Sequence, residues 1–387
     1  MAKVQGYCDP KFEKVKTLFQ EFIETGEENG AGITANIDGK IVIDMWGGYA
    51  DEDKKKPWEK DTIVNVWSST KTIAALAALM CADRGLISPY DKVAKHWPEF
   101  AENGKENIEI RHLLSHTSGL SAWDKPFEIE DLYDLKKSTD LLAKQKPWWE
   151  PGTASGYHAL SMGHLLGEIV RRATGKSLTQ FVAEEIAGPL GADFQIGAKE
   201  KDWDRIATLS PPPPPPPPDT PPDMESVAMK TFTSPAPNAL TALTPGWRKA
   251  EIGAANGHGN ARSLNRIMSN IPLGGNVDGH KLLSPKTIEQ IFDVQSDGQD
   301  LCLPLKLRFG IGYGLVQETN MFSIPTDEGK RRVCYWAGWG GSIVMMDLSR
   351  KSTFTYAMNK MAGGTTGSPR TLAYLKAYYD ALDGIDS

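Results

Sequence analysis

Ser68 and Lys71 are the residue pair whose types and spacing most clearly suit catalysis. They precede an apolar run from Ile73 to Ala82. Residues three positions apart share a helix face, so we expect the Ser68 hydroxyl and the Lys71 amine within hydrogen-bond reach. The run has no polar side, which predicts a buried helix, and burial lowers the pKa of a lysine. A neutral amine beside a hydroxyl is a general base beside a nucleophile. By itself, the spacing also fits an N-cap serine followed by a solvated lysine.

Tyr157 is the candidate partner for this lysine, because a lysine alone is an incomplete proton relay. It follows Pro151–Gly152 in a loop that leads directly into a predicted helix over 160–172. A phenol at such a junction can project into a crevice, where a nearby ammonium would favour its phenolate. An ordinary half-buried tyrosine fits the same pattern.

A glycine-rich strand around Gly338, Gly340 and Gly341 is the third candidate element. Glycines allow a backbone to approach a ligand closely. An exposed N–H of this strand could therefore pair with the Ser68 N–H to form an oxyanion hole. A tight bend or a bulge would need the same glycines.

Other residues could do chemistry, but their patterns are weaker. Trp148 and Trp149 could line an acyl pocket or pack beneath their loop. His112 and His116 have the spacing of a zinc pair on a helix, yet no H-E-x-x-H acid accompanies them, so we expect no metal site. His258, in a glycine-rich turn, is the one further histidine we consider as a substrate contact. The chain contains no G-x-S-x-G, the nucleophile motif of α/β-hydrolases.

The composition is that of a soluble globular enzyme. The chain has 387 residues and a formal net charge of −6, with acids and bases interspersed, which argues against nucleic-acid or anionic-membrane partners. Its four cysteines are widely separated, so reduced thiols are expected instead of a disulfide framework. The first residues lack an apolar signal core and no span reaches transmembrane length, so we expect a cytoplasmic protein.

Periodicity along the chain predicts the elements that position these residues. We expect an amphipathic helix over 12–22 and a hairpin turning at Asp38–Gly39. Two further helices should end at Gly175 and before Pro189, the second capped by Ser177. Expected strands span 309–316, 332–336, 342–346 and 353–358, with a hairpin turn over 347–351, and a helix over 372–382 closes the chain.

This order predicts an α/β (α+β) fold with an antiparallel sheet, flanking terminal helices and an inserted all-helical domain. The sheet domain would be discontinuous, comprising 1–100 and 245–387, and the helical domain would comprise 101–244. The proline-rich segment 209–222 should be an exposed polyproline loop, acting as a stiff spacer or as a ligand for proline-reading domains. The reactive residues would lie in the crevice between the two parts.

Together these elements resemble the superfamily of serine β-lactamases, penicillin-binding proteins and esterases, over nearly the whole chain. Beyond S-x-x-K, the chain carries runs typical of its class C-like branch, namely Leu113–Leu120 (LLSHTSGL), Pro151–Gly152 before Tyr157, Leu166–Glu168, Thr174–Ser177 and Asn256–Gly259. The resemblance implies the β-lactamase/transpeptidase-like fold. It also implies that Ser68 is the acylated nucleophile, Lys71 its proton acceptor and Tyr157 the base of deacylation, with the Trp339 N–H as second oxyanion donor.

Two departures from this pattern bear on the substrate. Trp336–Gly338 replaces the Lys-Thr-Gly box, as in family VIII carboxylesterases and related acyltransferases, so the cation for a β-lactam carboxylate is missing. Tyr157–Ala159 replaces Tyr-x-Asn, so an amide contact is missing as well. The resemblance makes Trp336, Gly338 and His158 candidate substrate contacts.

The sequence therefore predicts a serine hydrolase that cleaves short-chain carboxylic esters through acyl-Ser68. Its substrate would be a small ester, no cofactor is expected, and the protein would be a monomer or homodimer. An acyltransferase, β-lactamase or peptidase could use the same acyl-enzyme. A non-catalytic penicillin-binding-like scaffold is the alternative of another class.

Overall fold

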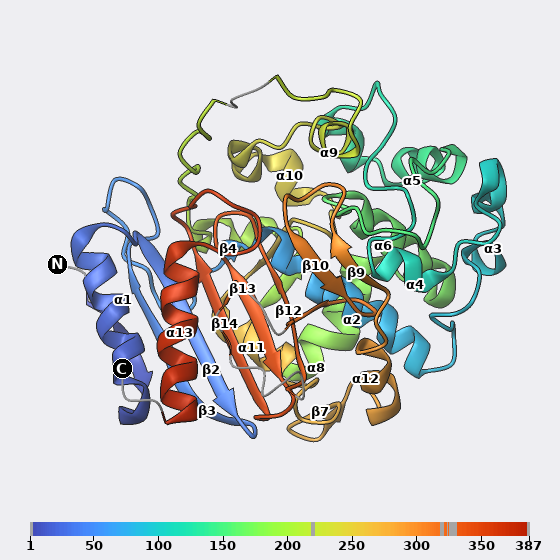
Figure 1. The fold of residues 1–387 in the computed structure, drawn as a ribbon. Coiled ribbons are helices and arrows are strands. Elements are labelled where there is room, and N and C mark those ends of the chain that lie inside the picture. Colours follow the sequence, from blue (N-terminus) through green and yellow to red (C-terminus); the bar gives the residue numbers. More distant parts are fainter. Residues whose placement is uncertain (1–2, 218–220, 318–320, 323, 325–330, 385–387) are drawn as a thin grey trace.

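A nine-stranded antiparallel sheet forms the centre of the computed structural model, which describes residues 3–217, 221–317, 321–322, 324 and 331–384 (Figure 1). Across the described part of this sheet the order is β1 (Gln5–Cys8), β3 (Lys40–Gly48), β2 (Gly30–Ile37), β14 (Ser352–Met358), β13 (Ile343–Asp347), β12 (Val333–Ala337), β11 (Gly314–Leu315), β10 (Lys306–Phe309) and β9 (Ser296–Gln299).

Helices cover both faces of the sheet. Neighbouring residues of a strand point to opposite faces, and on β14 the Tyr356 ring contacts Tyr374 while the Thr355 hydroxyl donates to the Ala261 carbonyl. One face therefore carries α1 (Glu13–Thr25) and α13 (Pro369–Asp383), which lie side by side in Figure 1. The other face carries α11 (Ala261–Met268).

Several predicted elements are confirmed. The β2–β3 hairpin turns at Asp38 and Gly39, whose φ angles of 49° and 79° are those of a type I′ turn. The terminal helices and the hairpin over 347–351 are also present. The chain thus has the predicted antiparallel sheet with terminal helices packed against it.

The apolar run after Lys71 forms α2 (Thr70–Asp83), which is buried from Thr70 to Cys81. It ends where Gly85 takes a φ of 72°, a conformation that glycine adopts without strain. The helix packs against α6 (Ser161–Thr174) and β12. Its position in the core is the one that its lack of a polar face predicts.

Two predicted elements are wrong in detail. The strand expected over 309–316 is a hairpin of β10 and β11, because a side chain at Gly310 would collide with the Ile291 carbonyl and Gly312 has a φ of 96°. The helix capped by Ser177 does not stop before Pro189. It runs through α7 (Leu178–Phe181), a π-helical turn over Val182–Ala187 and α8 (Gly188–Leu190), and the wider π turn accommodates the missing proline N–H.

The described chain contains further short elements. They are α3 (Val93–His96), α4 (Ile110–Leu114), α5 (Leu135–Lys144), α9 (Val227–Phe232), α10 (Pro245–Lys249), α12 (Pro285–Ile291), the hairpin of β7 (Asn276–Val277) and β8 (His280–Lys281), and a small sheet of β4 (Val64–Asn65), β6 (Gly257–Gly259) and β5 (Phe194–Ile196). Of these, α3, α4 and α5 pack against α6, and α12 packs against α2. Because β5 belongs to the expected helical domain and pairs with β6, the two parts share this sheet, and the division at 101 and 244 stays a prediction.

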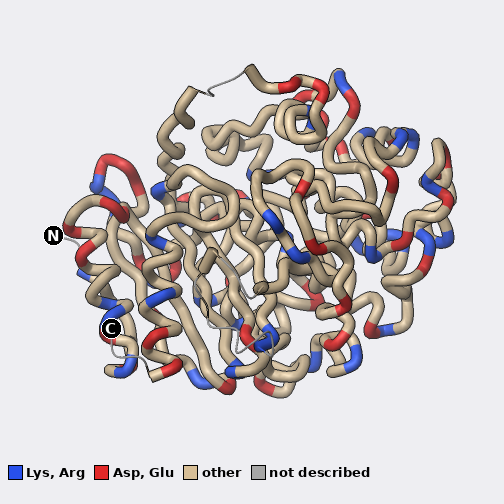
Figure 2. The backbone as a smooth tube through the Cα atoms, in the orientation of Figure 1, with Lys and Arg blue, Asp and Glu red and all other residues tan. Residues whose placement is uncertain are grey.

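Charges of both signs are interspersed along the chain (Figure 2). Within the described ranges, no helix combines the length and apolar character needed to span a bilayer. All four cysteines are unpaired thiols, and Cys81 and Cys334 are buried in α2 and β12. Residues 211–217 of the proline-rich segment lie outside any helix or strand and are mostly exposed, whereas residues 218–220 lie outside the described ranges.

Candidate active site

Ser68 lies in the 3₁₀ turn Trp67–Ser69 that leads into α2, and Lys71 lies in the first turn of that helix. The Lys71 Nζ is 3.0 Å from the Ser68 Oγ, the contact that their spacing predicts. Trp67 has a φ of 48°, which costs energy for a residue with a bulky side chain. Ser68 remains partly exposed, whereas Lys71 is only 1% exposed.

The surroundings of Lys71 favour its neutral form. Its Nζ lies 2.7 Å from the Ala159 carbonyl oxygen and 2.9 Å from that of Ala254. Burial lowers the Lys71 pKa well below the usual 10.5 of a lysine, since desolvation penalises the ammonium. The amine is thus more readily available as a base than that of an exposed lysine.

Tyr157 reaches Ser68 from the loop before α6. Its hydroxyl donates to the Ser68 Oγ at 2.6 Å and accepts from the Trp336 Nε1 at 3.3 Å. Burial raises the pKa of Tyr157, which is opposite to the expected stabilisation of a phenolate. The physical reason is that Tyr157 is itself buried, which disfavours the charged phenolate, and burial also disfavours the ammonium form of the facing Lys71, whose Nζ lies 4.7 Å from the centre of the tyrosine ring.

Asp300 holds the backbone of Tyr157 in place, and the sequence analysis missed it. Its Oδ1 accepts from the N–H groups of Tyr157 at 3.1 Å and of Cys302 and Leu303 at 2.9 Å each. The side chain is 4% exposed, and burial raises the pKa of its carboxyl. Nothing local in the sequence signals this role, because the contact spans 143 residues.

Gly338 brings the end of β12 against the backbone of Ser68. A side chain here would collide with the Val66 carbonyl and the Ser342 hydroxyl, and the Cβ position would lie 3.4 Å from the Ser68 nitrogen. The following Trp339 N–H donates to no protein group among the described residues. It is therefore available to an oxyanion beside Ser68.

An apolar cavity of about 190 Å³ opens beside Ser68. Much of its wall consists of aromatic, aliphatic and proline side chains, including Trp67, Leu160, Phe232, Pro235, Trp247 and Trp339. Larger hollows of about 480 and 610 Å³ lie elsewhere on the surface, but neither is lined by Ser68, Lys71 or Tyr157. The smaller cavity is the one that a group attached to Ser68 would enter.

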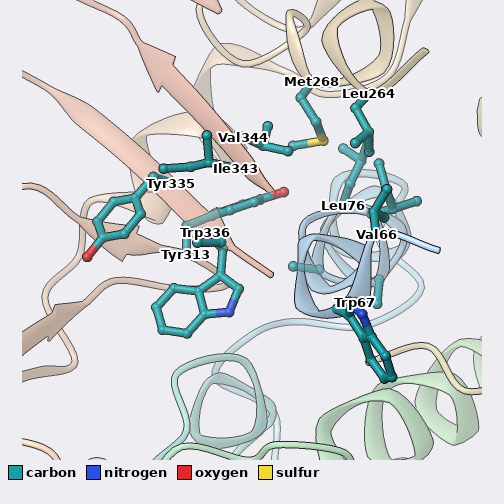
Figure 3. Close-up of a cluster of buried hydrophobic side chains, with 14 of the residues drawn as sticks. Val66, Trp67, Leu76, Leu264, Met268, Tyr313, Tyr335, Trp336, Ile343 and Val344 are labelled. Carbon is teal, nitrogen blue, oxygen red and sulfur yellow. The ribbon is translucent and has the colours of Figure 1, made fainter. Parts of the chain in front are cut away.

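Trp336 and His158 do not line this cavity. Trp336 is buried in the sheet (Figure 3), where its ring packs against Tyr157 and Phe309. His158 is fully buried, with its ring nitrogens bonded to the Gly156 carbonyl at 2.6 Å and the Ser118 hydroxyl at 2.6 Å. Burial lowers the pKa of His158 to about 4, so this ring is neutral.

Trp148, Trp149 and His258 also lie away from the cavity. The Trp148 Nε1 donates to the Asp124 carboxylate at 2.8 Å. The Trp149 Nε1 donates to the Ala154 carbonyl at 2.9 Å. Trp149 thus anchors its own loop, whereas Trp148 ties this loop to the segment around Asp124. His258 is fully buried in β6, and its Nδ1 lies 2.8 Å from the Asn256 carbonyl.

His112 and His116 do not share a helix face, because α4 ends at Leu114 and His116 has a φ of 61°. The His112 Nδ1 accepts from the Glu109 N–H at 3.1 Å, and the His116 Nδ1 accepts from the His158 N–H at 3.0 Å. Both rings therefore serve local structure. No group of three potential metal ligands occurs among the residues that the structure describes.

Comparison with known proteins identifies the family of the chain. The Beta-lactamase family model matches residues 15–379. "Esterase/beta-lactamase LipL" of Mycobacterium tuberculosis (strain ATCC 25618 / H37Rv) is 32% identical over 330 residues, which are 80% of this chain and 74% of that protein.

Two solved structures are similar over nearly the whole chain. A family VIII carboxylesterase matches with a TM-score of 0.90 and 35% identity, covering 98% of this chain and 100% of the other. A penicillin-binding protein homologue from Caulobacter crescentus matches with a TM-score of 0.88 and 34% identity at the same coverage. The chain therefore belongs to the Beta-lactamase family of serine hydrolases.

Proposed function

We propose that this protein is a carboxylesterase that cleaves short-chain esters through an acyl-Ser68 intermediate. The observation that carries the proposal is the position of the Ser68 Oγ, which lies 3.0 Å from a buried amine and 2.6 Å from a buried phenol. The similarity to a family VIII carboxylesterase and to a protein named esterase/beta-lactamase supports the same activity.

The hydrogen bonds of Lys71 support one direction of proton transfer. A neutral amine has two N–H donors and one lone pair, and a carbonyl oxygen can only accept. The carbonyls of Ala159 and Ala254 therefore use both N–H groups, which leaves the lone pair for the Ser68 hydroxyl. With the amine neutral, the Ser68 proton can therefore pass to the Lys71 lone pair, while the Ser68 Oγ accepts the hydrogen bond of Tyr157.

Acylation follows from this arrangement. The Ser68 Oγ attacks the ester carbonyl while its proton passes to the Lys71 Nζ. The N–H groups of Ser68 and Trp339 stabilise the oxyanion. The C–O bond to the alcohol then breaks, and the alcohol takes its proton from the Tyr157 hydroxyl. This leaves acyl-Ser68, a Lys71 ammonium and a Tyr157 phenolate.

Deacylation reverses the proton movements. The new ammonium and the Trp336 N–H both favour the phenolate, which removes a proton from water as the water attacks the acyl group. The Ser68 Oγ leaves and recovers its proton from Lys71. One ester and one water become one acid and one alcohol, and the scheme uses only side chains and backbone of this chain. The monomeric or homodimeric state stays a prediction.

Hydrolysis of p-nitrophenyl butyrate, measured beside labelling by a fluorescent phosphonate, tests the proposal. We expect turnover and labelling in the wild type and neither in Ser68→Ala. Absence of both in a folded wild-type protein would favour the non-catalytic scaffold. Labelling with turnover only in the presence of an added alcohol would identify an acyltransferase.

A further inference from the structure

The cavity beside Ser68 has no charged residue in its wall. Of its described lining residues, none is an aspartate, glutamate, lysine, arginine or histidine. A carboxylate or ammonium that entered would lose its hydration without gaining a partner, which is strongly unfavourable. The cavity therefore selects uncharged groups.

Two of the polar side chains in the wall already have partners. The Thr231 hydroxyl donates to the Val227 carbonyl at 2.7 Å and lies 2.7 Å from the Ser121 hydroxyl. The Asn238 side chain accepts from the Leu240 N–H at 2.9 Å. Thr231 and Asn238 are thus engaged within the protein, whereas the Trp67 Nε1 is a buried donor that bonds no group among the described residues. Recognition in this wall is therefore mainly by shape and apolar contact.

Three indoles form one aromatic side of the cavity. The Trp67 ring lies 5.4 Å from that of Trp247 and 5.1 Å from that of Trp339, both in tilted or edge-on contact. The Trp247 Nε1 donates to the Asn65 side chain at 3.0 Å, which fixes its ring. Such a preformed aromatic wall suits a flat ring. The size agrees, since an apolar protein cavity of about 150 Å³ binds benzene and this one is about 190 Å³.

The position of Tyr157 indicates which part of an ester, the acyl group or the alcohol, enters the cavity. The proposed mechanism requires the leaving alcohol to lie at the Tyr157 hydroxyl, and neither Tyr157 nor Lys71 lines the cavity. The alcohol therefore departs on the side of these two residues. The acyl group, which stays on Ser68, occupies the cavity.

We propose that the preferred substrates are esters of uncharged carboxylic acids that carry one benzene-sized ring. This inference rests on the proposed function, because it names the acyl group that Ser68 receives. The Phe232 and Pro235 side chains, which face the cavity from the segment after the proline-rich loop, complete the wall. Ring size and charge are thus selected by a part of the chain that takes no part in proton transfer.

Two isomeric esters test the assignment, with purified full-length protein and acid release followed in a pH-stat. Methyl phenylacetate carries the ring on its acyl side and benzyl acetate carries it on its alcohol side. We expect kcat/KM for methyl phenylacetate to exceed that for benzyl acetate and for methyl acetate by about tenfold or more. Equal values, or a preference for benzyl acetate, would overturn the acyl assignment while leaving the esterase proposal intact. Absence of any Ser68-dependent turnover would overturn both.

A second pair of esters tests whether the cavity excludes charged acyl groups. Methyl pentanoate and monomethyl succinate have similar length, but the latter ends in a carboxylate. We expect the neutral ester to be favoured by about a hundredfold or more. Thr365→Lys places a cation at the cavity and should raise kcat/KM for monomethyl succinate relative to methyl pentanoate by about fivefold. Comparable turnover of the two esters by the wild type would contradict the proposal.

Two variants, each of which removes one phenylalanine side chain, test where the substrate ring lies in the cavity. Phe232→Ala removes part of the wall and should lower the ratio of methyl phenylacetate to methyl acetate turnover by about tenfold. Phe292→Ala removes a half-buried ring that does not line the cavity, so the ratio should stay at the wild-type value. An unchanged ratio in Phe232→Ala, or an equal fall in both variants, would contradict the placement of the substrate ring against Phe232.

Discussion

The two sides of Ser68 differ in their chemistry and in the type of secondary structure that forms them. On one side, Lys71 on α2 and Trp336 on β12 belong to buried regular elements, and their polar atoms are hydrogen-bonded. On the other side, the cavity wall includes residues from short helices and loops, namely Thr231, Phe232, Pro235, Pro237, Asn238 and Thr365. Proton transfer needs atoms fixed within a fraction of an ångström, whereas acyl selection needs a shape that loop changes can alter.

The largest effects should follow changes on the polar side. Ser68→Ala and Lys71→Met should each lower kcat/KM for p-nitrophenyl butyrate by about 10³-fold or more, because each removes a member of one proton relay. The double variant should be hardly worse than either single variant, since the residues act as a unit. Losses that multiply in the double variant would mean that Lys71 acts independently of Ser68.

The comparison of an ester with a β-lactam tests the neutrality of the whole site. We expect kcat/KM for p-nitrophenyl butyrate to exceed that for nitrocefin by about a hundredfold or more. The reason is that Trp336 replaces the lysine of the family box and no charged side chain lines the described cavity, so the β-lactam carboxylate lacks a charge-assisted partner. Equal turnover of the two substrates would restore the β-lactamase assignment.

Trp336→Phe tests whether the buried indole acts on proton transfer or on substrate binding. Loss of the N–H that reaches Tyr157 should lower kcat by about tenfold and move the rising limb of the pH profile to higher pH, because the phenolate loses a donor. Trp123→Phe, which removes an indole N–H bonded to the Ser138 carbonyl, is the matched control and should leave the profile in place. An altered KM with an unshifted profile would instead place Trp336 at the substrate.

Lys71 should also affect stability, and the sign follows from its lowered pKa. Between the folded-state pKa and the unfolded value near 10.5, the unfolded chain binds a proton that the folded protein excludes. Wild-type stability therefore rises with pH in that interval, by up to about 1.4 kcal/mol per pH unit. Lys71→Met lacks this dependence. The free energy of unfolding of the wild type, minus that of Lys71→Met, should therefore decrease as pH falls from 10.5 towards the folded-state pKa.

Lys105 provides a contrast for this measurement. Burial lowers the pKa of Lys105 to about 8, so its contribution should stop changing below that pH. In urea titrations, the difference between Lys105→Met and the wild type should level off below pH 8, whereas the Lys71→Met difference should continue to grow. Identical curves for the two variants would contradict the deeper depression of the Lys71 pKa.

The parts of the fold with local signals were predictable from the sequence. Asp38–Gly39 specified a hairpin, the run from Ile73 to Ala82 specified a buried helix, and the spacing of Ser68 and Lys71 specified their contact. The strand over 309–316 was predicted wrongly, because β propensity does not reveal that glycines at 310 and 312 reverse the chain.

Features that depend on distant contacts were not predictable. Asp300 meets Tyr157 across 143 residues, and the three indoles that line the cavity come from separate segments. The adjacent Trp148 and Trp149 were candidates for an acyl pocket or for packing beneath their loop, and in the structure their indoles bond Asp124 and Ala154 and do not line the cavity. The burial of Trp336 likewise follows from sheet packing that no local pattern encodes.

Acylation of Ser68 is tested most directly by mass spectrometry of protein quenched during turnover of p-nitrophenyl butyrate. Trypsin should release residues 61–71, because lysines stand at positions 60 and 71. We predict a butyryl adduct on this peptide, localised by fragmentation to Ser68 instead of Ser69 or Thr70. The adduct should accumulate further in Tyr157→Phe, which slows deacylation. A butyryl group on another residue, or turnover that persists in Ser68→Ala, would contradict the assignment of Ser68 as the nucleophile.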